Sequence, residues 1–168
     1  MGITFNADEV LKMAERTEAN GAAFYRRAAE LQPESDKAMA DKLLGLADME
    51  DGHEKVFAAM RAELPERMRE ETAADPYMEA GLFLGSMADK HGGEGSPSAA
   101  DALTGEEDIE QILRTAIGLE EKSIVFYLGL KDMVPERLGK DKIDAIIDEE
   151  KGHIVLLADE LKKATSAS

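Results

Sequence analysis

The sequence predicts an all-α protein, one domain over residues 1–168, in which four helices form two antiparallel hairpins joined by a long crossover. The composition is the first indication, because Ala, Leu, Glu, Met and Lys abound while aromatic residues make up 5% and Trp is absent; this favours helix over sheet. Proline and glycine-rich stretches then divide the chain into four long segments. Each segment repeats apolar residues at three- and four-residue steps, which is typical of a helix with one buried face.

The first hairpin is predicted over residues 7–64. Pro33 separates its two helices. Ser35 or Asp36 can cap the second helix, because their side-chain oxygens accept N–H groups that the first turn of a helix leaves unpaired. This second helix ends before Pro65, since proline cannot continue a helix without the loss of a hydrogen bond.

The second hairpin is predicted over residues 104–163. Its first helix begins near Thr104, a capping residue followed by acidic residues, and ends before Pro135. Its second helix runs from about Glu136 to Lys163. The loops inside each hairpin are short, so the two helices that each loop joins are expected to be antiparallel.

Residues 65–103 are predicted to form the crossover between the hairpins. This stretch holds three prolines and a Gly- and Ser-rich run, which is typical of irregular structure. One short helix is expected inside it, over Tyr77–Ala88. The connection is long enough to run the length of the bundle, so the second and third long helices can lie parallel.

Charge and the lack of cysteine exclude several classes of protein. The chain has 36 acidic and 20 basic residues, a net charge of −16, and no cysteine. Disulfide scaffolds, thiolate metal sites and thiol nucleophiles are therefore excluded, and neither nucleic acid nor a membrane is expected as a partner. No apolar run approaches the ~20 residues that span a bilayer. The first nine residues have no basic region and no apolar run, so we expect a cytoplasmic protein without a secretory signal.

Each apolar stripe carries a glutamate near its middle, and two of the stripes add a histidine one turn later. A carboxylate at a buried position costs several kcal/mol unless it is compensated, and the stripes contain no Lys or Arg. Two divalent cations would balance four glutamates, and the oxygen and imidazole donors suit iron, manganese or zinc. The candidate metal ligands are Glu18, Glu50, His53, Glu120, Glu150 and His153.

The two hairpins also repeat a pattern. A glutamate is followed six residues later by Phe-Tyr in the first helix of each hairpin, and Glu-x-Gly-His recurs in the second. Each hairpin therefore supplies half of one site. Since glycine inside a helix costs about 1 kcal/mol relative to alanine, the recurrence of Gly52 and Gly152 leads us to expect that helices approach closely there.

These motifs resemble the ferritin-like carboxylate-bridged dimetal proteins, and among them the rubrerythrin-type diiron domain, over residues 7–64 and 104–163. The resemblance implies a ferritin-like bundle that holds two iron ions per chain, with Mn or Zn as other candidates, and an oxidoreductase that reacts with O2 or peroxide. It also implies the ligand roles: Glu18 and Glu120 as single-glutamate ligands, Glu50 and Glu150 as bridging carboxylates, and His53 and His153 as terminal ligands.

The sequence departs from rubrerythrins in two respects. Ser123 stands where they carry a further glutamate, so the resemblance does not extend to the ligand exchange that this glutamate performs. The chain also lacks the cysteines of a rubredoxin module. An external protein or a small reductant is therefore expected to supply electrons, and we expect a homo-oligomer, a dimer.

Two other functions remain open at this point. One is a ferroxidase or iron-handling protein, and the other is a non-enzymatic helical bundle stabilised by a metal. Within the site, Tyr25 and Tyr127 either donate hydrogen bonds to ligand carboxylates or are ordinary core tyrosines.

Some acidic residues near the motifs are not assigned as ligands. Glu121 is the alternative to the adjacent Glu120, and the Phe-Tyr alignment favours Glu120. His91 is expected to be exposed in a Gly- and Ser-rich loop. Four further acidic residues fall outside the stripes and are expected to face solvent: Glu15, Asp51, Glu54 and Glu149.

Overall fold

The computed structural model describes residues 7–66, 99–133 and 140–166, and these residues contain four long helices and no strand. The predicted short helix over Tyr77–Ala88 and the predicted loop around His91 lie outside the described residues. The described elements are α1 (Ala7–Glu30), the 3-10 turn η1 (Glu34–Asp36), α2 (Lys37–Ala62), α4 (Ile109–Met133) and α5 (Lys140–Ser166).

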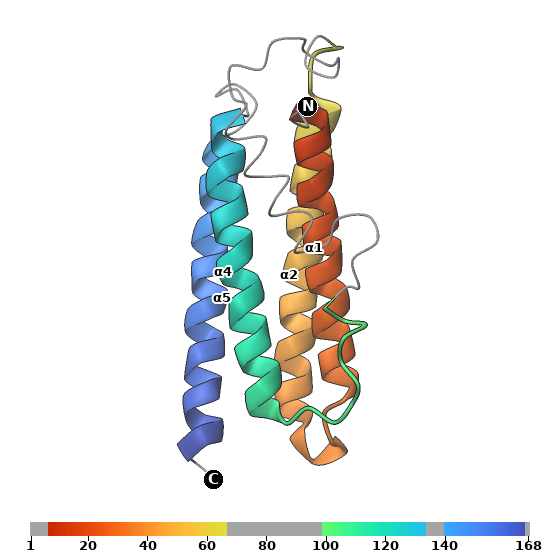
Figure 1. Ribbon diagram of the computed structural model, residues 1–168, viewed down its shortest axis with the longest axis vertical. Coiled ribbons are helices and arrows are strands. Elements are labelled where there is room, and N and C mark those ends of the chain that lie inside the picture. The colour runs from red at the N-terminus through yellow and green to blue at the C-terminus, as the bar shows by residue number, and fades with distance from the viewer. Residues whose placement is uncertain (1–6, 67–98, 134–139, 167–168) are drawn as a thin grey trace, which may run out of the picture.

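The four helices form two antiparallel hairpins that lie side by side (Figure 1). Helix α1 packs mainly on α2, and α4 packs mainly on α5, while α1 also contacts α4. Helices α2 and α4 run in the same direction, so residues 63–108 connect opposite ends of the bundle (Figure 1). The prediction of an all-α bundle of two hairpins with a long crossover is confirmed.

Side-chain caps define two of the helix starts. The Asp36 carboxylate accepts a hydrogen bond from the Met39 N–H at 3.2 Å, so Asp36 is the N-cap of α2. At α4, the Asp108 carboxylate accepts from the Gln111 N–H at 2.8 Å, and the Gln111 side chain accepts from the Asp108 N–H at 2.9 Å. This reciprocal pair is a capping box, which satisfies two donors at once.

The predicted start of the third helix near Thr104 was wrong by about one turn. Glu107 folds back and accepts hydrogen bonds from the Thr104 N–H and hydroxyl, at 3.0 and 2.9 Å. Gly105 has a φ of 91°, a left-handed conformation that glycine adopts readily. These contacts form a separate turn, and the helix begins only at Ile109. The last helix extends to Ser166, three residues beyond the predicted end.

The core consists of two apolar clusters at the two ends of the bundle. One contains Leu11, Phe57, Met60, Tyr127, Leu130 and Ile143 among others. The other contains Phe24, Tyr25, Leu43, Leu46, Leu113 and Leu157 among others. Among the described residues, no helix is both long enough and apolar enough to cross a membrane.

Candidate metal centre

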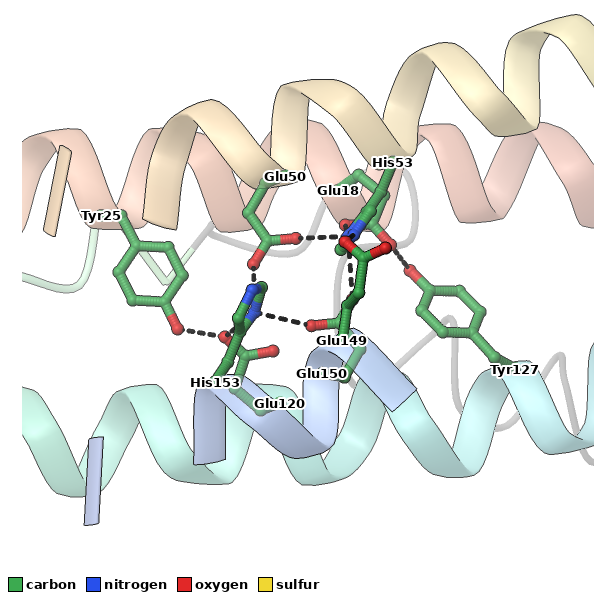
Figure 2. Close-up of polar contacts among 9 residues, drawn as sticks. All are labelled: Glu18, Tyr25, Glu50, His53, Glu120, Tyr127, Glu149, Glu150 and His153. Atoms are coloured by element: carbon green, nitrogen blue, oxygen red, sulfur yellow. Dashed lines mark hydrogen bonds and ion pairs between the residues drawn. The ribbon is translucent and has the colours of Figure 1, made fainter. Parts of the chain in front are cut away.

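A layer of charged residues lies between the two apolar clusters, with at least one member from each helix (Figure 2). All six residues predicted as ligands are here, and each exposes 4% or less of its surface. They are Glu18 from α1, Glu50 and His53 from α2, Glu120 from α4, and Glu150 and His153 from α5. Glu121, the alternative to Glu120, is exposed.

The six residues form two overlapping sets of four. One set is Glu18, Glu50, His53 and Glu150, and the other is Glu50, Glu120, Glu150 and His153. Within each set, one donor atom per residue lies within 4.8 Å of the others. Glu50 and Glu150 belong to both sets, so each would be shared by two ions if both sets were occupied.

The imidazole Nδ1 atoms point into these sets. His53 Nδ1 lies 3.1 Å from Glu150 Oε1, 3.4 Å from Glu50 Oε2 and 3.5 Å from Glu18 Oε2. His153 Nδ1 lies 3.0 Å from Glu150 Oε2, 3.4 Å from Glu120 Oε1 and 3.5 Å from Glu50 Oε1. In each half, therefore, one nitrogen and several carboxylate oxygens converge on the same small volume.

The site has an approximate two-fold symmetry that relates the hairpins. The glutamate and histidine are three residues apart in both α2 and α5, so they project from one face. The Phe24–Tyr25 and Phe126–Tyr127 ring pairs have the same geometry, with centroids 5.6 Å apart and planes at 72°. The repeat in the sequence thus reflects two equivalent halves of one site.

Two tyrosines connect the hairpins through the ligand carboxylates. The Tyr25 hydroxyl donates a hydrogen bond to Glu120 Oε1, and the Tyr127 hydroxyl donates one to Glu18 Oε1. Both tyrosines are almost completely buried, at opposite ends of the charged layer (Figure 2). Each hydroxyl fixes one oxygen of a carboxylate from the other hairpin. The second oxygen of Glu18 faces His53, whereas Glu120 faces His153 with the same oxygen that Tyr25 contacts.

In the absence of metal, the four glutamates differ in the direction of their pKa shifts. Burial, and next the interaction with Glu50, raise the pKa of Glu18 well above its usual value. Burial raises the pKa of Glu120 to about 8. Burial acts in the same direction on Glu50 and Glu150. Contacts with Glu18 and both histidines outweigh it at Glu50, and contacts with both histidines and Glu120 outweigh it at Glu150, so the pKa of both is lowered.

The same surroundings raise the pKa values of both histidines. Burial alone would lower their pKa values, but the adjacent carboxylates outweigh it. Glu150 and Glu18 raise the pKa of His53 far above its usual value, and Glu120 and Glu150 raise that of His153 to about 12. The metal-free site is therefore neutral near pH 7, with protons on Glu18, Glu120 and both imidazoles.

Several buried nitrogen and oxygen atoms of the site have no hydrogen-bond partner among the described residues. They are His53 Nδ1, both carboxylate oxygens of Glu150, and both ring nitrogens of His153. Unsatisfied buried polar atoms are rare in native proteins because each costs about 1–3 kcal/mol. The two Nδ1 atoms and the Glu150 oxygens converge on one small buried volume without hydrogen bonds among them, so the residues fit a pair of metal ions.

The sequence analysis did not predict the contact between Glu149 and His53. Glu149 was expected to face solvent, but its Oε2 lies 3.0 Å from His53 Nε2, although 54% of the side chain is exposed. Two other residues expected to be solvated form ion pairs, Asp51 with Arg26 and Glu15 with Arg61. The only signal for Glu149 was its place directly before Glu150.

The close helix approach expected at Gly52 and Gly152 was wrong. A Cβ atom added at either position would meet no heavy atom within 4 Å. Gly52 is half-buried and Gly152 is exposed. A glycine that does adjoin the site is Gly21, where an added Cβ would lie 3.5 Å from Glu50 Cγ.

The fold and site can be compared with known proteins. Among solved structures, the chain is similar to a Thermotoga maritima protein described as ferritin-like and diiron-carboxylate, with 23% identity and a TM-score of 0.72. The match covers 96% of this chain and 97% of that one. No protein-family profile and no curated protein matches the chain. The chain thus has the ferritin-like fold, with a carboxylate and histidine cluster suited to metal ions at its centre.

Proposed function

We propose that the cluster binds two iron ions and that the protein is a rubrerythrin-like oxidoreductase, which reduces peroxide or O2. The observation that carries the proposal is the pair of overlapping ligand sets that share Glu50 and Glu150. The description of the Thermotoga maritima protein as diiron-carboxylate supports the same assignment. Mixed carboxylate and imidazole donors also suit iron.

Each ligand has a distinct part in this proposal. Glu18 and His53 would hold one ion, Glu120 and His153 the other, and Glu50 and Glu150 would bridge them. Two divalent ions carry a charge of +4, which balances the four carboxylates when both histidines are neutral. When bound, the two Fe(II) ions supply the two electrons that reduce peroxide to water.

The protein residues would prepare the site for this chemistry. The apolar clusters on both sides exclude water, which strengthens electrostatic interactions inside the site. Burial, and next the charge of Glu120 or Glu18, raise the pKa of Tyr25 and Tyr127, respectively. Both hydroxyls thus keep their protons and remain donors, and each holds a ligand carboxylate in one orientation.

Anaerobic loading with two Fe2+ per chain followed by one equivalent of H2O2 tests the proposal. We expect rapid growth of ferric charge-transfer absorption in the near ultraviolet, with two Fe2+ oxidised for each peroxide consumed. The Glu50→Ala variant is the control, because it removes a carboxylate common to both ligand sets. Oxidation in the wild type no faster than in this variant would contradict the proposal.

The same experiment separates the two other functions. A ferroxidase continues to oxidise Fe2+ far beyond two ions per chain when O2 is supplied, and it retains the product. A peroxide reductase instead consumes many equivalents of peroxide once a reductant is added. A metal that only stabilises the bundle would do neither, and zinc would then replace iron with no loss of folding stability.

The source of electrons is part of the proposal. The sequence contains no cysteine, so it supplies no thiolate ligand for a rubredoxin-type iron site. We propose that a separate redox protein or a small reductant donates the electrons, and that the protein works as a homodimer. Sizing by light scattering, together with turnover assays with different reductants, tests both points.

A further inference from the structure

The two histidines differ in what their outer ring nitrogens contact. His53 Nε2 lies 3.0 Å from the Glu149 carboxylate, which comes from the other hairpin. His153 Nε2 is buried and has no hydrogen-bond partner among the described residues. The rings are otherwise alike, nearly parallel at 22° with centroids 5.9 Å apart. The outer contact is thus a clear difference between the two halves of the site.

The sequence repeat explains this difference. The residue directly before Glu150 is Glu149, whereas the residue directly before Glu50 is Met49. By the approximate two-fold symmetry, Met49 holds the position relative to His153 that Glu149 holds relative to His53. A thioether is at most a weak hydrogen-bond acceptor, so the second histidine lacks the carboxylate that the first one has.

Glu149 reaches His53 across an open groove between α2 and α5. Gly52, Val56 and Ala145 line this groove together with His53 and Glu149. Helices α2 and α5 make few contacts with each other compared with the helices inside each hairpin. The carboxylate therefore spans the seam between the hairpins and contacts a buried ligand from the solvent side.

We propose that Glu149 is a positioning residue for His53 and makes the two metal positions unequal, with tighter binding at the position next to His53. The inference rests on the proposed function. A carboxylate that accepts the Nε2–H fixes the tautomer, leaves the Nδ1 lone pair free for the metal and makes the imidazole a stronger donor. The metal next to His153 has no such support and dissociates first.

Titration of the metal-free protein with Co2+ tests this inference, because visible absorption and calorimetry report each binding step without any turnover. Wild-type protein is expected to bind two Co2+ with different dissociation constants. Loss of a residue that supports a metal-bound histidine typically costs 10–100-fold in affinity. Glu149→Ala is therefore expected to weaken the tighter step by at least about 10-fold and leave the other within about threefold.

Three further variants sharpen the test. Glu149→Gln keeps a carbonyl acceptor without the charge, so it is expected to fall between the wild type and Glu149→Ala. Met49→Glu supplies the missing carboxylate beside His153 and is expected to strengthen the weaker step and narrow the difference. Glu121→Gln is the matched control, an exposed neighbour of a ligand without a contact to either histidine, and it leaves both steps unchanged. Thermal melting of each metal-free variant reports whether it still folds.

The outcomes separate this inference from the function on which it rests. If wild-type protein binds no Co2+ in this layer, the proposed function fails and the inference fails with it. If two ions bind and Glu149→Ala changes neither step, or both steps equally, the inference alone is overturned. A selective loss at one step in folded Glu149→Ala protein, graded through Glu149→Gln, supports it.

Discussion

Tyr25 in the first hairpin donates its hydroxyl hydrogen bond to Glu120 in the second, and Tyr127 returns the same contact to Glu18. These two bonds cross the interface between the hairpins on either side of the charged layer. They therefore orient carboxylates of the site and also connect the two halves of the bundle.

Replacement of Tyr25 by Phe is expected to destabilise the metal-loaded protein by about 1.5–3 kcal/mol, the range for a hydrogen bond to a charged group. The aromatic ring stays in place, so packing changes little. Urea denaturation of the wild type and the variant measures the difference. Tyr127→Phe is expected to give a similar loss because of the two-fold symmetry, and a change below about 0.5 kcal/mol in both variants would contradict the assigned role.

Removal of one bridging carboxylate is expected to affect both metal positions. Glu150→Ala eliminates a donor from each ligand set, so we expect stoichiometric binding of two ions to be lost. Glu54→Ala, one turn beyond Glu50, removes a carboxylate outside both sets and is expected to leave stoichiometry unchanged. Metal analysis after gel filtration compares the two variants. Loss of metal in Glu54→Ala and retention in Glu150→Ala would show that the ligand register is displaced by one turn.

The metal-free protein is expected to lose folding stability as the pH rises from about 5 to 8. The pKa of Glu120 is about 8 in the folded protein and near 4.5 in the unfolded chain, so the folded state binds more protons between these values. The raised pKa of His153 acts in the same direction above pH 6.5. Each such proton contributes about 1.4 kcal/mol per pH unit.

Denaturation with urea at several pH values, in the presence of a chelator, measures this dependence. Below about pH 4.5 the sign reverses, because Glu50 and Glu150 have lowered pKa values and must take up protons. Glu120→Gln carries a permanently neutral side chain, so its metal-free form is expected to show a shallower decline between pH 5 and 8 than the wild type. An equal slope in the two proteins would refute the assignment of that proton to Glu120.

Metal binding at pH 7 is expected to release about four protons for two ions, one each from Glu18, Glu120, His53 and His153. The affinity for metal should consequently rise steeply with pH. Calorimetric titration in buffers of different ionisation enthalpy gives the number of protons released. A value near zero would mean that the site is already ionised without metal.

Much of this architecture could be predicted from the sequence because the apolar residues and the glutamates among them recur with the period of a helix. Burial of Glu18, Glu50, Glu120 and Glu150 follows from their positions on apolar stripes with a helical period, and this holds in all four helices. Because the pattern recurs in both hairpins, each candidate ligand in one hairpin had a counterpart in the other. The two-hairpin topology followed from short loops within each hairpin and one long connection between them.

The features that could not be predicted depend on contacts between side chains that do not follow the helical period. Thr104 and Asp108 can each cap a helix, and only the turn closed by Glu107 shows that Asp108 prevails. Glu149 lies off its stripe, and its contact with His53 exists only because α2 and α5 face each other across a groove. Gly52 lies on the open side of the same groove, so its recurrence did not indicate close packing.

Anomalous diffraction from crystals loaded with Fe2+ under anaerobic conditions tests the central claim most directly. Two peaks per chain are predicted in the charged layer, one among Glu18, Glu50, His53 and Glu150 and the other among Glu50, Glu120, Glu150 and His153. Metal peaks only at the surface, with the six side chains still clustered around protons or water, would contradict the account.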